Sequence, residues 1–80
     1  MHVYILYSDS LSKYYVGHTN SINRRLYEHN SGHSKFTRKG KPWELIFTCE
    51  CTTRKEAVTL EGKIKKRGIR RYLEDNNITL

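Results

Sequence analysis

Residues 2–19, HVYILYSDSLSKYYVGHT, decide the fold of this chain because they hold two β-forming segments joined by a turn. Residues 2–7 and 14–19 are rich in β-branched and aromatic side chains, which favour strands. Residues 8–13 are polar and typical of a turn. The pattern predicts an antiparallel hairpin with Gly17 inside its second strand. A glycine there indicates that a ligand or another part of the chain comes close.

Signals for a helix follow the hairpin. Asn20 or Ser21 can cap a helix that runs to about residue 30, and Gly32 can end it in a left-handed conformation. Within this helix Ile22 and Leu26 lie four residues apart and supply its buried stripe. A basic connection over residues 34–42 then leads to the second half of the chain.

The second half reads as one strand and two helices. Residues 43–51, WELIFTCEC, predict a third strand. Thr53 and Glu56 have the spacing of a capping box, in which Glu56 returns to the amide of the cap, and this helix runs to about residue 67. Gly68 closes it, and residues 69–75 form a short last helix. We therefore predict an α+β fold of order β-β-α-β-α-α, with a small three-stranded antiparallel sheet flanked by helices, as one domain over residues 1–80.

The charge of the chain favours a polyanionic partner. Lys and Arg outnumber Asp and Glu by 15 to 8, a formal net charge of +7 in 80 residues. DNA, RNA or an acidic membrane surface would suit this excess, and the alternative is a well-solvated basic surface. No stretch reaches the roughly 20 apolar residues of a membrane span, and no signal peptide is evident. Cys49 and Cys51 lack the spacing of a structural zinc site. We expect a cytoplasmic, reduced protein with no membrane partner.

Glu61 is the most informative polar residue. In the predicted second helix Ala57, Leu60, Glu61 and Ile64 fall on one face, so a carboxylate shares an apolar stripe. Burying an unpaired carboxylate is costly, so Glu61 needs a cation, a metal ion or hydrogen-bond donors. The alternative is a glutamate at the edge of the stripe that turns to solvent or pairs with a lysine of its own helix.

Further polar and aromatic candidates lie on the other elements. Arg25 and His29 are four residues apart, beside the apolar stripe of the first helix. Taken singly, they predict a surface ion pair and a hydrogen-bonded packing residue. The hairpin also carries four of the six tyrosines, and strand tyrosines are ordinarily core or cross-strand partners. A phenol that enters a site can instead orient a water molecule or accept its proton.

These residues, in this order, resemble the GIY-YIG nuclease superfamily. The resemblance rests on His2-Val3-Tyr4, Tyr15-Val16-Gly17, Arg25, His29 and Glu61, and it covers almost the whole chain. It is closest to the small stand-alone bacterial members, the UPF0213 or YhbQ-like proteins. The first motif lacks its glycine. The asparagine that longer members carry after the glutamate helix is assigned to neither Asn76 nor Asn77.

The resemblance implies a metal-dependent endonuclease that hydrolyses phosphodiester bonds in nucleic acid. DNA is favoured as the substrate, and the sequence leaves RNA open. Glu61 would hold one divalent cation, Mg²⁺ or Mn²⁺, and Arg25 would stabilise the phosphate. Tyr4, with Tyr15 or His29, would activate or orient the attacking water, and which of the three is the base stays open. The implied catalytic positions are Tyr4, Tyr15, Gly17, Arg25, His29 and Glu61, with Gly17 letting backbone and substrate approach.

Binding would depend on the remaining positive charge. The candidate phosphate contacts are Lys35, Arg38, Lys39, Lys41, Lys65 and Lys66, with Arg67 beside them. The alternative for each is plain solubility. Without a separate DNA-targeting domain, we expect low sequence specificity and targeting by a partner protein. Two rival interpretations are a catalytically silent nucleic-acid-binding module on the same fold and a structural domain with a polar core network.

Overall fold

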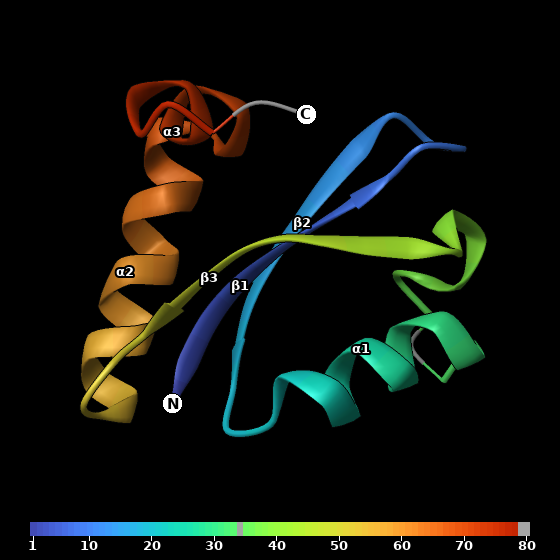
Figure 1. Ribbon diagram of the computed structural model, residues 1–80, viewed down its shortest axis with the longest axis horizontal. Helices are drawn as coiled ribbons and strands as arrows, with labels where there is room; N and C mark the ends of the chain where they lie inside the picture. The colour runs from blue at the N-terminus through green and yellow to red at the C-terminus, as the bar shows by residue number, and fades with distance from the viewer. Residues whose placement is uncertain (34, 79–80) are drawn as a thin grey trace.

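The structure is a computed structural model that describes residues 1–33 and 35–78, and it has the predicted element order (Figure 1). The elements are β1 (His2–Ser8), β2 (Lys13–Thr19), α1 (Ile22–Ser31), the 3₁₀ helix η1 (Arg38–Gly40), β3 (Trp43–Glu50), α2 (Arg54–Arg67) and α3 (Ile69–Asp75). The predicted α+β class is confirmed. Only the 3₁₀ turn was not anticipated, and Ser34, where the basic connection begins, lies outside the described residues.

The sheet has the order β2-β1-β3 with antiparallel neighbours throughout. The predicted hairpin is confirmed, since β1 and β2 pair continuously from His2 opposite Thr19 to Ser8 opposite Lys13. In this register Tyr4 lies opposite Gly17. Because β1 is central, β2 is an edge strand, and side chains from both sheet faces can reach the space beside it.

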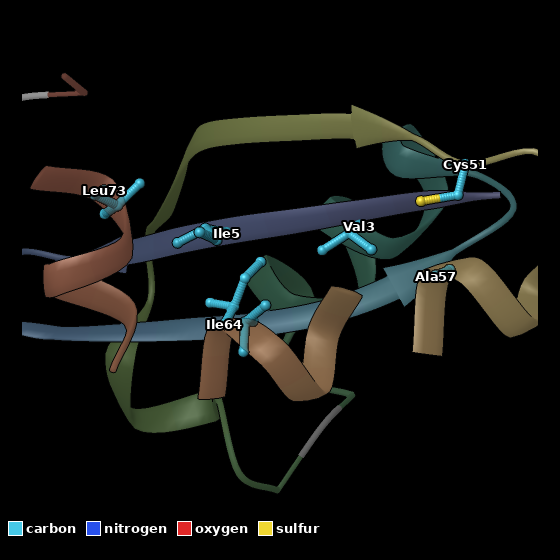
Figure 2. Close-up of a cluster of buried hydrophobic side chains, with 7 residues drawn as sticks. Val3, Ile5, Cys51, Ala57, Ile64 and Leu73 are labelled. Atoms are coloured by element: carbon cyan, nitrogen blue, oxygen red, sulfur yellow. The ribbon is translucent and has the colours of Figure 1, made fainter. Parts of the chain in front are cut away.

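Helices cover both faces of the sheet, and each face has its own small core. Val3, Ile5 and Val16 face α2 and α3, where they pack with apolar side chains of those helices (Figure 2). Tyr4 and Leu6 point the other way, because successive strand residues alternate between faces. They pack with Trp43 and with the half-buried Ile22 and Leu26 of α1. A bulge in β3 leaves Ile46 without a partner on β1, and Ile46 and Phe47 both pack on the α2 side.

Side-chain caps fix the ends of the two longer helices. Ser21, rather than Asn20, caps α1, and its hydroxyl accepts a hydrogen bond from the Arg24 amide at 3.3 Å. The Thr53 hydroxyl caps α2 by accepting from the Glu56 amide at 3.2 Å. Glu56 was predicted to return to the amide of the cap residue, Thr53. Its carboxylate instead accepts a hydrogen bond from the amide of the preceding residue, Thr52, at 3.0 Å. No helix within residues 1–33 and 35–78 is long and apolar enough to cross a membrane.

The C-terminal end of α1 is tied to the sheet by polar groups. The Asn30 side chain accepts from the Trp43 amide and donates to the Trp43 carbonyl, as a neighbouring strand would. His29 is the buried residue of α1, whereas the predicted stripe residues Ile22 and Leu26 are only half-buried. The helix therefore presents a histidine, more than a leucine, to the centre of the molecule.

Candidate active site

A cleft of about 420 Å³ lies beside the edge strand β2, and four elements line it. Its lining includes Tyr4, Tyr15, Gly17, His18, Arg24, Arg25, Arg54 and Glu61. Five of the six predicted catalytic positions therefore share one cleft. The sixth, His29, lies in an adjoining hollow that Tyr15 and Arg25 also line. The side chains of Tyr4 and Tyr15 lie on the sheet face that α1 covers, whereas Glu61 belongs to α2 on the opposite face. The two groups therefore come together only around the open edge of the sheet at β2.

Gly17 gives room to the phenol of Tyr4. A Cβ atom at Gly17 would lie 2.8 Å from the Tyr4 hydroxyl oxygen and 3.2 Å from a ring carbon of Tyr15. A Cβ atom does not approach another heavy atom as closely as 2.8 Å, so Tyr4 or the backbone of β2 would have to shift. The group that comes close to this glycine is thus the opposite tyrosine, which crosses the backbone of β2 to reach the cleft.

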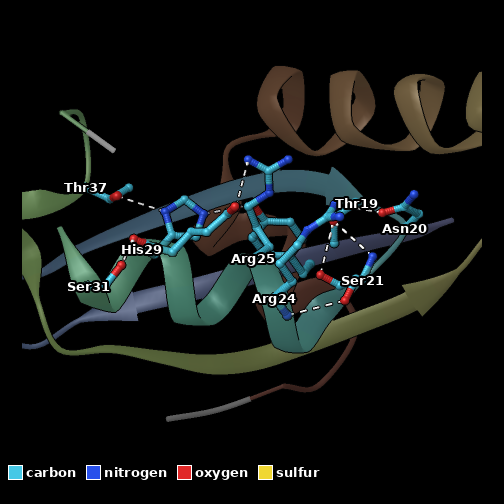
Figure 3. Close-up of polar contacts among 10 residues, drawn as sticks. Thr19, Asn20, Ser21, Arg24, Arg25, His29, Ser31 and Thr37 are labelled. Carbon is cyan, nitrogen blue, oxygen red and sulfur yellow. Dashed lines mark hydrogen bonds and ion pairs between the residues drawn. The ribbon is translucent and has the colours of Figure 1, made fainter. Parts of the chain in front are cut away.

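A chain of hydrogen bonds leads from the cleft into the protein. The Tyr4 hydroxyl lies 3.0 Å from His29 Nε2. His29 Nδ1 lies 2.8 Å from the Thr37 hydroxyl, a contact that Figure 3 shows. Burial lowers the pKa of His29, and the positive charge of Arg25 lowers it further. The imidazole is therefore neutral at pH 7, with one nitrogen donating and the other accepting. Burial, followed by the neighbouring Tyr15, raises the pKa of Tyr4, so its phenol is also neutral.

Arg25 carries a donor without a protein acceptor. Its Nε is buried and has no hydrogen-bond partner among the described residues, while Nη1 lies 3.6 Å from the Glu28 carboxylate. A buried donor without a partner is costly, whereas the rest of the guanidinium is on a side chain that is 42% exposed. Arg24 on the same helix donates to the Asn20 side chain at 2.9 Å, also in Figure 3. With Arg54 from the start of α2, three arginines line the cleft, which suits a phosphate.

The Glu61 carboxylate meets two donors in the structure. His18 Nδ1 donates to Oε1 at 2.7 Å, and Lys65 Nζ donates to Oε2 at 2.8 Å. Burial alone would raise the pKa of Glu61, but the hydrogen bonds from Lys65 and His18 outweigh it and hold the pKa below its usual value. The glutamate is thus ionised, and the pairing with a lysine of its own helix, raised above as the alternative, is present.

His18 is a functional candidate that the sequence reasoning missed. The available signal was strand alternation, because His18 must share a face with Val16, and that face is the one covered by α2. The position of α2 over this face could not be read from the sequence. Arg24 and Arg54 were also missed, because each looks like an ordinary solvated cation next to a helix start.

The residues present fit a hard divalent cation. Mg²⁺ and Mn²⁺ take oxygen ligands, and magnesium keeps several of its waters, so one carboxylate and a substrate phosphate suffice. Glu61 is ionised, and its side chain is 17% exposed at the cleft. Lys65, which now balances its charge, is 58% exposed and can swing away. Within residues 1–33 and 35–78 no group of three or more His, Cys, Asp or Glu side chains could form a closed metal cage.

The predicted phosphate contacts fall into separate groups. Lys65 and Lys66 both line a shallow hollow at the α2–α3 junction together with Arg70 and Arg71, and Lys65 also pairs with Glu61. Arg67 is engaged in a two-point ion pair with Asp75, at 2.7 and 3.0 Å. The remaining four, Lys35, Arg38, Lys39 and Lys41, are exposed around the 3₁₀ turn.

The two C-terminal asparagines lie away from the cleft. The Asn76 side chain donates to the Tyr72 carbonyl at 2.8 Å, and Asn77 has a positive φ of 58°. Neither residue lines the cleft that holds Glu61. Their observed contacts belong to the end of α3.

A three-stranded antiparallel sheet with tyrosines, an arginine and a glutamate gathered at its edge strand defines a small α+β domain with one polar, arginine-lined cleft. The family model of the GIY-YIG catalytic domain matches residues 1–72, and the chain belongs to the GIY-YIG family. This membership makes it a relative of nucleases that generally use a divalent metal ion and act on nucleic acid.

Curated relatives carry the name UPF0213. The chain is 38% identical to UPF0213 protein YazA of Bacillus subtilis over 56 residues, which is 69% of this chain and 57% of the relative. It is also 38% identical over 66 residues to a UPF0213 protein of Halobacterium salinarum, covering 81% and 84% of the two chains. The match thus spans little more than half of the Bacillus relative. No solved structure is significantly similar to the chain.

Proposed function

We propose that this protein is a metal-dependent endonuclease that hydrolyses phosphodiester bonds in nucleic acid, DNA in preference to RNA, with low sequence specificity. One observation carries the proposal: an ionised glutamate, a buried phenol and an arginine with an unpaired donor converge on one cleft from opposite faces of the sheet. A module that only binds nucleic acid needs surface cations but no inward carboxylate.

The proposed roles follow from the contacts. The Arg25 guanidinium, on a side chain that is 42% exposed and lines the cleft, donates to a non-bridging oxygen of the scissile phosphate. Tyr4 is neutral, so it serves as a base only if its own proton leaves. As the phenol oxygen takes a proton from the attacking water, its O–H proton passes to His29 Nε2, which lies 3.0 Å away. Thr37 accepts from Nδ1 and holds the tautomer in which Nε2 is free.

Glu61 would hold the divalent cation, which when bound supplies charge stabilisation at the phosphate and the leaving oxygen. His18 holds the carboxylate in its orientation, as outer hydrogen bonds do for metal ligands. The ring of Tyr15 packs edge-on against His29, with 4.9 Å between the ring centroids, and helps to hold the imidazole in place.

The first experiment compares cleavage by the wild type, Glu61→Gln and Glu50→Gln. Each is incubated with labelled single-stranded, duplex and branched DNA and with RNA, with magnesium or manganese. Glu50 is a matched control because its side chain is 83% exposed and lies outside the cleft. We expect metal-dependent cleavage by the wild type and Glu50→Gln and a loss of at least about 100-fold for Glu61→Gln.

Three outcomes would contradict the proposal. Equal cleavage by all three proteins would indicate a contaminant. Binding by all three without cleavage would support the catalytically silent module. A marked loss of thermal stability in Glu61→Gln, without any response of the wild type to magnesium, would support the structural alternative.

A further inference from the structure

The basic connection before β3 presents an aromatic side chain to solvent. Phe36 is 92% exposed, whereas the other phenylalanine, Phe47, packs edge-on against Tyr72 at 5.7 Å between ring centroids. Single exposed apolar residues are common on protein surfaces. Phe36 differs from them because the backbone beside it is firmly anchored.

The anchors lie at the two ends of residues 37–40, the segment that directly follows Phe36. Thr37, the next residue, is buried, and its hydroxyl contacts His29 while its carbonyl accepts from the Trp43 indole at 2.6 Å. Three residues later, Gly40 is buried under the Trp43 ring, and its carbonyl accepts from the Ser8 hydroxyl at 2.7 Å. Phe36 therefore directly precedes an anchored stretch of backbone, and its side chain is exposed to solvent.

The surroundings of Phe36 are cationic. Lys35, Arg38, Lys39 and Lys41 are all exposed, and none of them forms an ion pair within residues 1–33 and 35–78. Many proteins bind single-stranded nucleic acid with an aromatic ring that is surrounded by lysine and arginine side chains. The cations contact the phosphates, and the ring stacks on a base.

The segment is also linked to the candidate active site. Thr37 ends the hydrogen-bond chain that runs through His29 to Tyr4, so Phe36 is the residue next to that end. We propose that Phe36 is a stacking platform for an unpaired nucleobase of the strand whose phosphate lies in the cleft. This inference rests on the proposed function and narrows the substrate class to nucleic acid with an unpaired base near the cut.

The test measures stacking without relying on cleavage. Phe36→Trp places a fluorescent indole at the platform, and Val58→Trp is the matched control because Val58 is 51% exposed on α2. Both proteins are titrated with a short single-stranded oligonucleotide and with the same sequence as a duplex, without metal. We expect the single strand to quench the emission of the indole introduced by Phe36→Trp and not that of Val58→Trp. The buried Trp43 contributes equally to both signals.

The affinities of Phe36→Ala and Phe36→Tyr for the single strand and for the duplex are then compared with those of the wild type. We expect Phe36→Ala to bind the single strand about 5- to 100-fold more weakly, to bind the duplex like the wild type and to keep its melting temperature. Phe36→Tyr should bind normally.

Three results would overturn the inference. The first is equal single-strand affinity of Phe36→Ala and the wild type, and the second is an unquenched indole in a saturated complex of Phe36→Trp. The third is equal weakening for single strand and duplex, because that marks a wedge in duplex DNA. Stacking without any cleavage by the wild type would instead reject only the proposed nuclease activity.

Discussion

Tyr4 and Gly17 face each other across the β1–β2 pair, and the geometry of the candidate site depends on this one contact. The Tyr4 side chain is buried and hydrogen-bonded to His29, so it has little room to move when a methyl group is added opposite it. We predict that Gly17→Ala lowers the free energy of unfolding by about 1–3 kcal/mol. Nuclease activity should fall further than this loss explains, because the phenol is displaced from the cleft.

Gly62→Ala is the control for that change. Gly62 lies in the middle of α2 on its solvent-exposed side, and a Cβ there would meet nothing within 4 Å. This variant should keep its activity and gain about 0.5–1 kcal/mol, because alanine favours the helix. Urea unfolding and cleavage assays of both variants check the pair. Normal activity in Gly17→Ala would show that the position of the Tyr4 phenol does not matter.

His29 gives a pH dependence of stability with a defined sign. Its pKa in the folded protein is below the value of about 6.5 expected in the unfolded chain. Between these two values the unfolded chain binds more protons, so stability falls as the pH drops through 6.5 and levels off below the folded pKa. The carboxylates Glu61 and Asp75, whose pKa values are also lowered, contribute only at more acidic pH.

We predict that the free energy of unfolding of the wild type declines more from pH 7.5 to pH 5 than that of His29→Gln. Chemical denaturation at both pH values measures this difference. The other histidines are present in both proteins and cancel in the comparison. Equal declines would mean that the imidazole is not held neutral by its surroundings.

Among the elements, α1 depends on the sheet for its position. Its buried residue is a histidine, and its end is held by the two hydrogen bonds between the Asn30 side chain and the Trp43 backbone. We predict that Asn30→Ala costs about 1–3 kcal/mol, because two backbone groups of β3 lose their partner. Asn23→Ala, on the exposed side of α1, should be neutral or slightly stabilising. Urea unfolding midpoints of the two variants test this prediction. Similar midpoints would contradict the role of Asn30 in anchoring α1 to the sheet.

Element boundaries were predicted well because each has a local cause. The Ser21 and Thr53 caps and the Gly32 and Gly68 ends act through hydrogen bonds or backbone angles within a few residues. The partner of Glu61 was not predictable in this way. His18 is 43 positions away, and only the packing of α2 over the β1–β2 face brings the two together.

For the whole molecule, the net charge of +7 predicts nucleic-acid affinity that falls steeply with salt. The structure adds a distinction between neighbouring cations. Lys66 is exposed and has no ion pair within residues 1–33 and 35–78, while Arg67 is engaged with Asp75. We predict that Lys66→Ala reduces the slope of log affinity against log salt by about 1, whereas Arg67→Ala leaves the slope unchanged and lowers the melting temperature. Binding titrations across salt concentrations test this, and equal slopes for Lys66→Ala and the wild type would remove Lys66 from the interface.

The sequence by itself determined the order of the elements, the hairpin, the Thr53 cap and, through family motifs, the six candidate catalytic positions, because periodicity, turn chemistry and motifs are local in the chain. Only the tertiary structure decided that Tyr4 crosses Gly17, that His18 holds Glu61 and that Thr37 anchors both His29 and the Phe36 segment. These contacts join residues on different elements, so they exist only once the helices have packed on opposite faces of the sheet and both sets of side chains meet at its open edge.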